Sequence, residues 1–138
     1  SAMMPCESSS QVSNSTNGLE PPRGPVSVKS SKGGAFNQVV PNYAENRLFY
    51  DFAWELAKTG NKGYLTQCSI IQKWNDQAIS LNTYYLPSRY ENGKVPMSEI
   101  IDDILFANFY GNKNMYYHNT DDGSGLDMSD DGCEGCKL

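Results

Sequence analysis

The sequence predicts an α/β domain, in which strands and helices alternate along the chain. Two kinds of periodicity support this. Short segments alternate apolar and polar residues, as strands do, and longer segments repeat apolar residues every three or four positions, as helices do. The order strand, helix, strand, helix, strand is typical of an α/β layout. The 138 residues are enough for one modest domain with a buried core.

The first 25 residues are rich in Ser, Asn, Gly and Pro, and we expect a loop that contains one short helix. Ser8 and Gln11 have the spacing of a capping box, which places the expected helix start there. Residues 26–29 and 36–40 alternate as strands do. Lys32-Gly33-Gly34 between them indicates a hairpin turn.

Two helices and a strand are expected in the middle of the chain. Asn42 and Glu45 have the spacing of a capping pair, and Gly60 ends the helix that follows. Its apolar positions recur at helical spacing: Leu48, Phe49, Phe52, Ala53, Leu56 and Ala57. A shorter helix over residues 67–75 should bury Ile70, Ile71 and Trp74. Residues 79–85 then have the pattern of a strand, and residues 87–96 that of a loop.

The segment from Met97 to Tyr110 has the clearest helical pattern in the chain. Asp102 and Asp103 should point away from its apolar face, and Gly111 should end it. That face is formed by Met97, Ile100, Ile101, Ile104 and Leu105. Residues 115–117 follow as a short strand.

Charge is concentrated at the C-terminus. Residues 119–138 hold six carboxylates and one lysine, which leaves 10 acidic and 10 basic residues before them. Few apolar residues and high charge predict a flexible, disordered tail. No basic patch favours nucleic acid. No run approaches the roughly 20 apolar residues of a membrane span, and no secretory signal is visible. Four irregularly spaced cysteines fit a reducing compartment, so we expect a cytoplasmic protein without a membrane partner.

Three groups of residues could have a chemical role. A helix start among the hydroxyls of residues 8–10 could bind an anion, although an ordinary helix cap has the same pattern. Tyr116 and Tyr117 could equally be a strand with one ring on each face. Cys133 and Cys136 form a C-x-x-C pair on the acidic tail. They fit carriers of electrons better than strongly activated nucleophiles, because thiolates form poorly near negative charge.

A zinc site is an alternative use of the same thiols. It would need His118 together with Cys133 and Cys136, and the sequence identifies no fourth ligand. We therefore expect no metal on this chain.

These segments together resemble the large subunit of class I ribonucleotide reductases. Residues 1–11 are similar to the phosphate-binding loop of that family, and four further segments continue the match to the bacterial and phage type: residues 17–24, 94–97, 115–120 and 131–138. The resemblance covers essentially the whole chain but only the C-terminal fifth or so of such a subunit. It implies the C-terminal portion of a ten-stranded β/α barrel over residues 1–118, followed by a flexible redox-shuttle tail over 119–138.

The resemblance also implies roles for individual residues. The loop that holds the substrate diphosphate corresponds to Pro5, Cys6, Glu7, Ser8 and Ser9. Cys6 stands where the family commonly has serine or threonine and is not expected to be a catalytic thiol. Tyr116 and Tyr117 match the adjacent pair that relays a radical to the active site. Because strand alternation would separate neighbouring rings, the backbone must bend or the rings must turn.

In the family, the dithiol matched by Cys133 and Cys136 reduces the active-site disulfide and is itself reduced by thioredoxin or glutaredoxin. No cofactor is implied on this chain. A diiron/tyrosyl-radical centre is expected on the small subunit, and nucleotide effectors on the upstream part of the large subunit. The expected partners are these two components and a ribonucleoside diphosphate. The helix over 97–110 would line the groove where the small subunit's tail docks.

The resemblance places the thiyl-radical cysteine, the reducible cysteine pair and the allosteric sites upstream of Ser1. A piece cut from a longer protein, a split gene and an intein product would each begin this way, and Ser1 suits intein chemistry. The hypothesis is a naturally split subunit. The alternative class is a non-enzymatic thiol-redox or interaction module with a disulfide-exchanging tail.

Overall fold

The computed structural model describes residues 1–31 and 34–121, and it forms a mixed arrangement of helices and strands. In chain order the elements are α1 (Glu7–Ser13), β1 (Val26–Ser31), β2 (Gly34–Val39), α2 (Tyr43–Asn46), a 3-10 turn (Arg47–Phe49), α3 (Ala53–Ala57), α4 (Lys62–Gln72), β3 (Leu81–Tyr85), a second 3-10 turn (Pro87–Arg89), α5 (Met97–Phe109) and β4 (Met115–Thr120). The expectation of an α/β chain agrees with this mixture.

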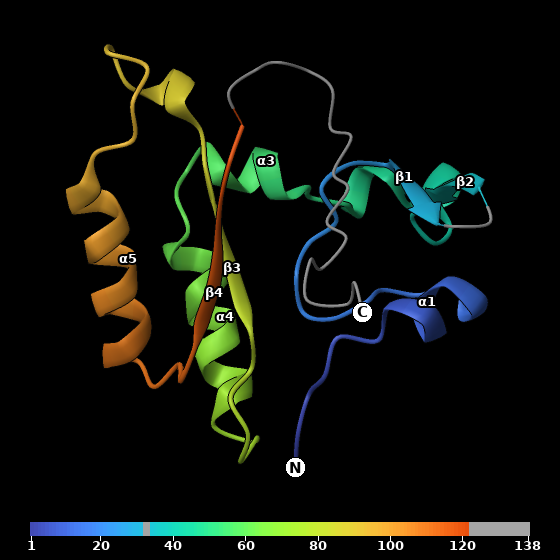
Figure 1. Cartoon of the computed structure of the whole chain (residues 1–138), viewed down its shortest axis with the longest axis horizontal. Coiled ribbons are helices and arrows are strands. Elements are labelled where there is room, and N and C mark those ends of the chain that lie inside the picture. Colours follow the sequence, from blue (N-terminus) through green and yellow to red (C-terminus); the bar gives the residue numbers. More distant parts are fainter. Residues whose placement is uncertain (32–33, 122–138) are drawn as a thin grey trace.

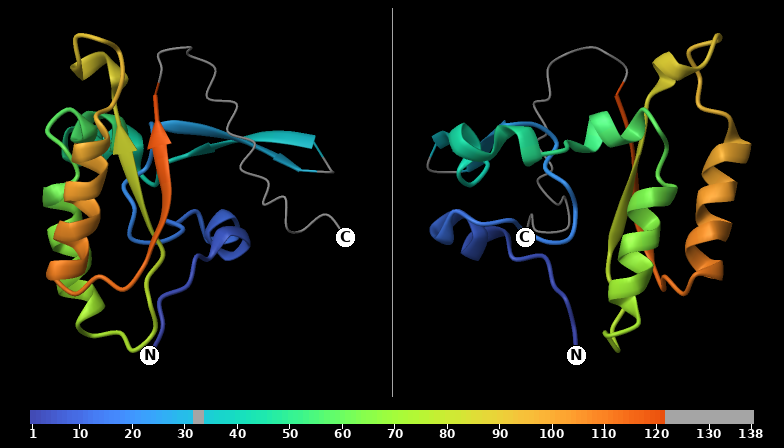
Figure 2. Two further views of the ribbon diagram at one scale, coloured as in Figure 1. Left: turned by 60° about the vertical axis from the view of Figure 1, so that its left-hand side comes forward. Right: turned by 180° about the vertical axis from the view of Figure 1, so that it is seen from behind.

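The strands form two separate two-stranded sheets. β1 and β2 pair antiparallel, from Val26 opposite Val39 to Ser31 opposite Gly34, and make the expected hairpin. β3 and β4 pair in parallel, with α5 as the crossover between them. Helices α4 and α5 lie side by side on one face of the parallel sheet, while α1 and the hairpin lie beyond its other face (Figures 1 and 2).

The buried core lies between the parallel sheet and the two helices. Its main cluster consists of Leu65, Cys68, Ile79, Leu81 and Ala107. Met3 and Leu19 pack against this cluster from the N-terminal segment, so the core anchors both ends of the loop between them. A second cluster, formed by Ala53, Ala57, Tyr84 and Leu86, joins α3 to β3.

The prediction of a single helix after Asn42 was wrong. Asn42 adopts a left-handed backbone conformation (φ 50°) and makes no side-chain cap. The chain forms one helical turn, a 3-10 turn and an extended break at Tyr50 and Phe52 before α3 begins. In the break the Tyr50 ring stacks on Phe52, with centroids 6.3 Å apart, and its hydroxyl donates to the Pro41 carbonyl at 2.7 Å. These contacts override the helical pattern, and Leu48 and Phe49 remain exposed.

The helix expected over residues 67–75 begins earlier and presents a different face. α4 starts at Lys62 and buries Leu65, Cys68 and Gln72, whereas Ile70 and Trp74 are exposed rather than buried. Gln72 is buried because its side chain closes the turn into β3. Its amide nitrogen donates to the carbonyls of Asn75 and Gln77, and its oxygen accepts from the Ile79 N–H.

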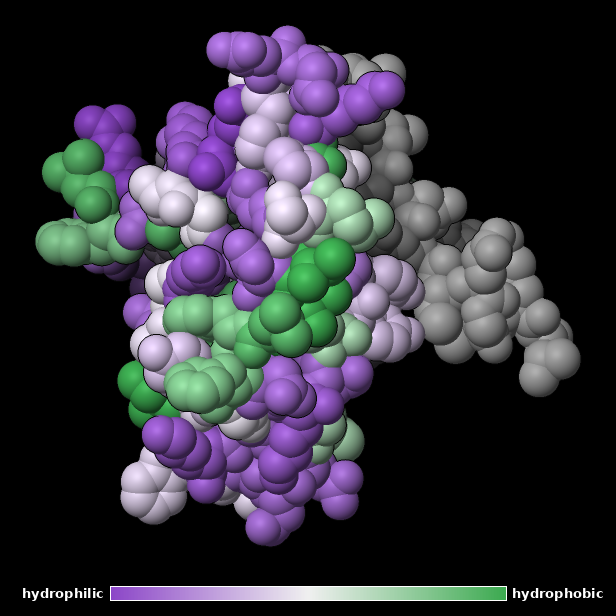
Figure 3. All heavy atoms as spheres, turned by 90° about the vertical axis from the view of Figure 1, so that its left-hand side faces the viewer, coloured by the Kyte–Doolittle hydropathy of each residue, from purple (hydrophilic) through white to green (hydrophobic). Residues whose placement is uncertain are grey.

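The helix expected over residues 97–110 is confirmed as α5, but the prediction of which face it buries was wrong. Asp103 is 3% exposed and Ala107 1%, so the side containing an aspartate faces the core. Asp103 Oδ2 accepts hydrogen bonds from Asn61 Nδ2 at 2.8 Å and from the Tyr85 hydroxyl at 3.1 Å, which makes a buried carboxylate tolerable. The apolar residues Met97, Ile101, Ile104 and Leu105 are exposed instead, and Figure 3 shows hydrophobic side chains gathered on this side of the molecule.

Two smaller differences concern the chain near the expected site. α1 begins at Glu7 with Cys6 as its N-cap, two residues before Ser8, the N-cap expected from the capping-box spacing. β4 continues through Thr120, beyond the expected strand, and Asp121 N–H still donates to the Tyr85 carbonyl at 3.1 Å. The rest of the expected tail, with Cys133 and Cys136, lies outside the described residues.

Candidate functional site

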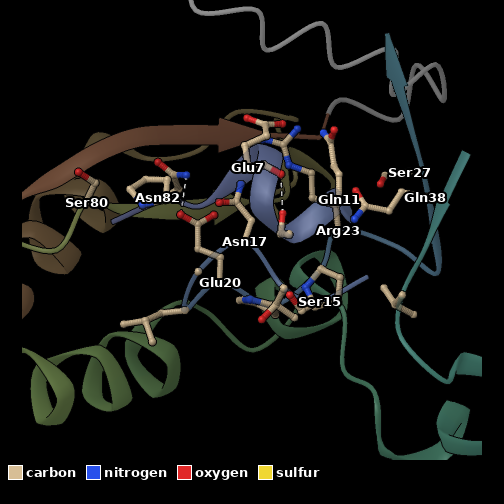
Figure 4. Close-up of a pocket in the computed structure, with 18 of the residues that line it drawn as sticks. Glu7, Gln11, Ser15, Asn17, Glu20, Arg23, Ser27, Gln38, Ser80 and Asn82 are labelled. Carbon is tan, nitrogen blue, oxygen red and sulfur yellow. Dashed lines mark hydrogen bonds between the residues drawn. The ribbon is translucent and has the colours of Figure 1, made fainter. Parts of the chain in front are cut away.

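A cavity of about 620 Å³ opens on the face of the parallel sheet opposite α4 and α5. One side, which we call the sheet wall, is β3 with β4 and contributes Asn82, Tyr84, Tyr116 and Tyr117. The other side, which we call the loop wall, is the segment 3–24. The hairpin contributes residues 27–28 and 38–39. Figure 4 shows polar side chains of the loop wall, Asn17, Glu20 and Arg23 among them, beside Asn82 of the sheet wall.

The five residues matched to the diphosphate loop lie at the start of α1. Pro5 and Glu7 line the cavity, whereas Cys6, Ser8 and Ser9 are exposed beside it. The Cys6 N–H donates to both the backbone carbonyl and the side-chain oxygen of Asn17, at 3.0 and 2.9 Å. The first intrahelical bond runs from Ser10 N to Cys6 O, so the N–H groups of Ser8 and Ser9 precede the helical ladder. Asn17 thus fixes where the helix begins.

Tyr116 and Tyr117 have adjoining rings although they are neighbours on a strand. Their centroids are 4.4 Å apart and the planes meet at 70°, an edge-to-face contact. The pairing with β3 shifts register between Leu81 and Thr83, which marks a bulge at this point. The bent backbone therefore resolves the conflict between strand alternation and ring contact. Both rings are about half exposed and both line the cavity.

Four loop-wall and sheet-wall residues were missed as site residues by sequence reasoning: Glu20, Arg23, Asn82 and Tyr84. Asn82 Nδ2 donates to Glu20 Oε1 at 2.7 Å, and the Tyr84 hydroxyl donates to Glu20 Oε2 at 2.6 Å. Arg23 Nη2 donates to Asn119 Oδ1 at 3.3 Å. The available signal was a charged residue on each side of Pro21-Pro22, because proline removes backbone donors and leaves side chains to make the loop's hydrogen bonds.

Burial controls the protonation of Tyr84 on the sheet wall. Burial, followed by the charge of the nearby Glu20 carboxylate, raises the pKa of the Tyr84 phenol. Tyr84 therefore stays protonated and keeps donating to Glu20 across the physiological range. His118 contacts the same strand, with Nδ1 2.7 Å from the Thr83 hydroxyl.

The cysteines that the structure describes are not a redox pair. Cys6 and Cys68 are both free thiols. Cys6 is exposed, and its thiol donates to the Met4 carbonyl at 3.3 Å. Cys68 is buried in the core. Burial raises the pKa of the Cys68 thiol to about 11. Within residues 1–31 and 34–121, no group of three or more His, Cys, Asp or Glu side chains is arranged to hold a metal ion. The proposed pair Cys133 and Cys136, and the zinc alternative that uses it, lie outside the described residues.

Comparison with known proteins connects this geometry to a family. The profile of the family described as "Ribonucleotide reductase, barrel domain" matches residues 1–118. The chain belongs to this family. It is also 62% identical to the ribonucleoside-diphosphate reductase subunit alpha of Enterobacteria phage T4, and 50% identical to ribonucleoside-diphosphate reductase 1 subunit alpha of Escherichia coli K12.

Both alignments cover all of this chain and 19% of the relative. The corresponding subunit of Haemophilus influenzae is 51% identical over 99% of the chain and 18% of its own length. The chain therefore spans about a fifth of the length of the curated relatives it matches. None of the helices in the described part of the chain is long and apolar enough to cross a bilayer.

Proposed function

We propose that this chain supplies the C-terminal part of the large subunit of a ribonucleoside-diphosphate reductase. The observation that carries the proposal is the contact between Tyr116 and Tyr117 on the wall of a large cavity, in a chain of this family. The complete enzyme would reduce ribonucleoside diphosphates to deoxyribonucleoside diphosphates by radical chemistry, in the cytoplasm. β3 and β4 would contribute two strands of the ten-stranded barrel, because a parallel sheet normally continues on both sides.

The tyrosine pair would pass a radical from the small subunit toward the active site. One phenol loses an electron and a proton and becomes a phenoxyl radical, and it is restored when the neighbouring phenol gives up its own electron and proton. Ring centroids 4.4 Å apart provide the short path that such an exchange requires. The radical source, a diiron/tyrosyl-radical centre, would belong to the small subunit.

The loop from Pro5 to Ser9 would hold the substrate diphosphate. The Ser8 and Ser9 hydroxyls and first-turn N–H groups are donors suited to phosphate oxygens, and the cavity begins at Pro5 and Glu7. Arg23 adds a positive charge to the loop wall.

Cys133 and Cys136 would deliver reducing equivalents to the active-site disulfide in the upstream part of the subunit. The two tail thiols become a disulfide while the active-site disulfide becomes two thiols. Thioredoxin or glutaredoxin then reduces the tail disulfide and is itself oxidised to a disulfide. Cys133→Ser or Cys136→Ser should stop cycles driven by thioredoxin and spare cycles driven by a small dithiol. Loss of both would point to a structural role.

The outer face of α5 would receive the tail of the small subunit. Its exposed apolar side chains, Met97, Ile101, Ile104 and Leu105, have no other described function. Leu105→Glu should weaken subunit association about tenfold or more, since a charge would enter an apolar contact. Ser88→Glu, at an exposed position after β3, is the matched control and should leave the affinity unchanged.

A chimera tests the proposal as a whole. This chain would replace the C-terminal fifth of the phage T4 subunit and be combined with the phage small subunit. We expect diphosphate reduction, and loss of turnover with Tyr116→Phe while substrate still binds, since a phenyl ring cannot lose a hydroxyl proton. A folded chimera that binds both substrate and small subunit yet has no activity would count against the proposal.

A further inference from the structure

The contact between the two tyrosine rings depends on a bulge in the parallel sheet. Leu81 lies opposite Met115 and Thr83 opposite His118, so two steps along β3 match three steps along β4. Tyr116 and Tyr117 therefore share the position that faces Asn82. Bulges are rare between parallel strands, and each leaves one residue outside the regular ladder. This one must be held by contacts beyond the ladder itself.

The side chain of Asn82 makes such a contact. Its Oδ1 accepts a hydrogen bond from the Tyr117 backbone N–H at 3.0 Å. The same side chain donates through Nδ2 to Glu20 Oε1 at 2.7 Å. Asn82 thus bridges the bulge on one side and the loop wall on the other, and Figure 4 shows the dashed hydrogen bond between Asn82 and Glu20.

Glu20 determines which end of the Asn82 amide faces the bulge. An ionised carboxylate only accepts hydrogen bonds, so the NH₂ group must point to Glu20 and the oxygen must point to Tyr117. Glu20 is itself held by the Tyr84 hydroxyl at 2.6 Å. Tyr84 is 4% exposed and packs edge-to-face on Trp54, with centroids 5.2 Å apart. The orientation of the amide is therefore fixed from the buried core.

We propose that Asn82 and Glu20 are positioning residues that hold the bulge at Tyr117 and thereby keep the rings of the tyrosine pair in contact. The inference rests on the radical-transfer role proposed above. Transfer between two phenols depends steeply on their separation, and a displacement of about 1 Å can cost on the order of a hundredfold in rate. Neither residue needs to touch the substrate to act in this way.

Turnover of the T4 chimera with its small subunit tests the proposal. Asn82→Ala should lower kcat about 10- to 100-fold and leave the KM for the diphosphate within about twofold, because the substrate loop is unchanged. Asn114→Ala, an exposed asparagine just before β4, is the matched control and should behave as the parent chimera. Parental kcat in Asn82→Ala would overturn the proposal.

A pair of variants at Glu20 provides a rescue test. Glu20→Ala removes the acceptor for the Asn82 amide and should lower kcat as Asn82→Ala does. Glu20→Gln keeps an oxygen for that amide and a polar group for Tyr84, so it should recover most of the loss. Equal activity of the two Glu20 variants would show that the amide's orientation does not matter, and would contradict the proposal.

Amide hydrogen exchange tests whether Asn82 holds the bulge, independently of the radical chemistry. In Asn82→Ala the peptide that contains Tyr117 should exchange at least about tenfold faster, while peptides of α4 and α5 keep their protection. Unchanged exchange at Tyr117 would overturn the proposal that Asn82 holds the bulge, even if turnover fell. Conversely, if Tyr117→Phe turns over normally, the radical-transfer role fails, and the exchange result still decides whether Asn82 holds the bulge.

Discussion

The sheet wall and the loop wall enclose the same cavity but are built in opposite ways. Leu81, Thr83 and Tyr85 of the sheet wall are fully buried, and their strand is fixed by backbone pairing with β4 and by the core behind it. Pro5 to Ser9 of the loop wall are all exposed, and the loop is held by a few hydrogen bonds such as that from Cys6 N to Asn17. The buried strand and the exposed loop therefore suit two different tasks.

A radical relay needs side chains at a fixed separation, and the sheet wall can provide it. A substrate site needs donors that a ligand can reach, and the exposed loop wall can provide those. The two walls meet at Glu20, a loop-wall residue whose carboxylate binds both Asn82 and Tyr84 of the sheet. Variants that affect one wall and spare the other can therefore test this division.

The largest expected effect lies behind the sheet wall, where Asp103 of α5 bonds Tyr85 of β3. Asp103→Ala removes the acceptor for Asn61 and for the Tyr85 hydroxyl and leaves a buried space. We expect the free energy of unfolding to fall by about 3 kcal/mol, because two buried donors lose their partner. Thermal unfolding of the T4 chimera measures this. Asp102→Ala, an exposed neighbour on α5, should change stability by less than about 0.5 kcal/mol; equal effects at the two positions would contradict the account.

A smaller effect, confined to binding, is expected on the loop wall. The double change of Ser8 and Ser9 to Ala removes two hydroxyl donors. At about 1 kcal/mol per hydrogen bond, this should raise the KM for the diphosphate about thirtyfold. The kcat should stay near that of the parent, because the tyrosine pair is not touched. Steady-state kinetics distinguishes the two parameters. Ser13→Ala, in the last turn of α1, is the control; a fall in kcat alone would assign these serines a different role.

The smallest effect concerns two thiols that take no part in the proposed chemistry. Because burial raises the pKa of Cys68 to about 11, on the order of one thiol in a thousand is ionised at pH 8. Iodoacetamide at that pH should modify exposed Cys6 and leave Cys68 unmodified in the folded chimera. Peptide mass analysis reports both sites. Rapid modification of Cys68 would mean that the core behind the sheet wall opens far more readily than its burial indicates.

Local patterns predicted some of the fold and missed what depends on distant partners. The hairpin and α5 follow from alternation and helical spacing. The direction that α5 faces does not, because Asp103 is buried by bonds to Asn61 and Tyr85, which are 42 and 18 residues away. The helix expected after Asn42 failed for a more local reason, since the stacking of Tyr50 on Phe52 favours an extended chain there.

The candidate site, too, was only partly predictable from the sequence. The roles of the diphosphate loop and the tyrosine pair were predicted from a family resemblance that residue order alone can carry, and they remain predictions. The bulge that brings the rings together, and the Asn82–Glu20 bond across 62 positions, were not predictable from spacing. An amide that bonds a distant carboxylate and a neighbouring strand leaves no periodic trace in the sequence.

The most direct test of the central claim is the turnover of the T4 chimera that carries Tyr117→Phe, measured beside Tyr110→Phe, whose ring is not among those lining the cavity. Diphosphate binding is measured on the same preparations. We expect Tyr117→Phe to bind the diphosphate as the parent does and to have no turnover above background, while Tyr110→Phe retains parental activity. Parental turnover by Tyr117→Phe would show that the tyrosine pair does not carry the radical.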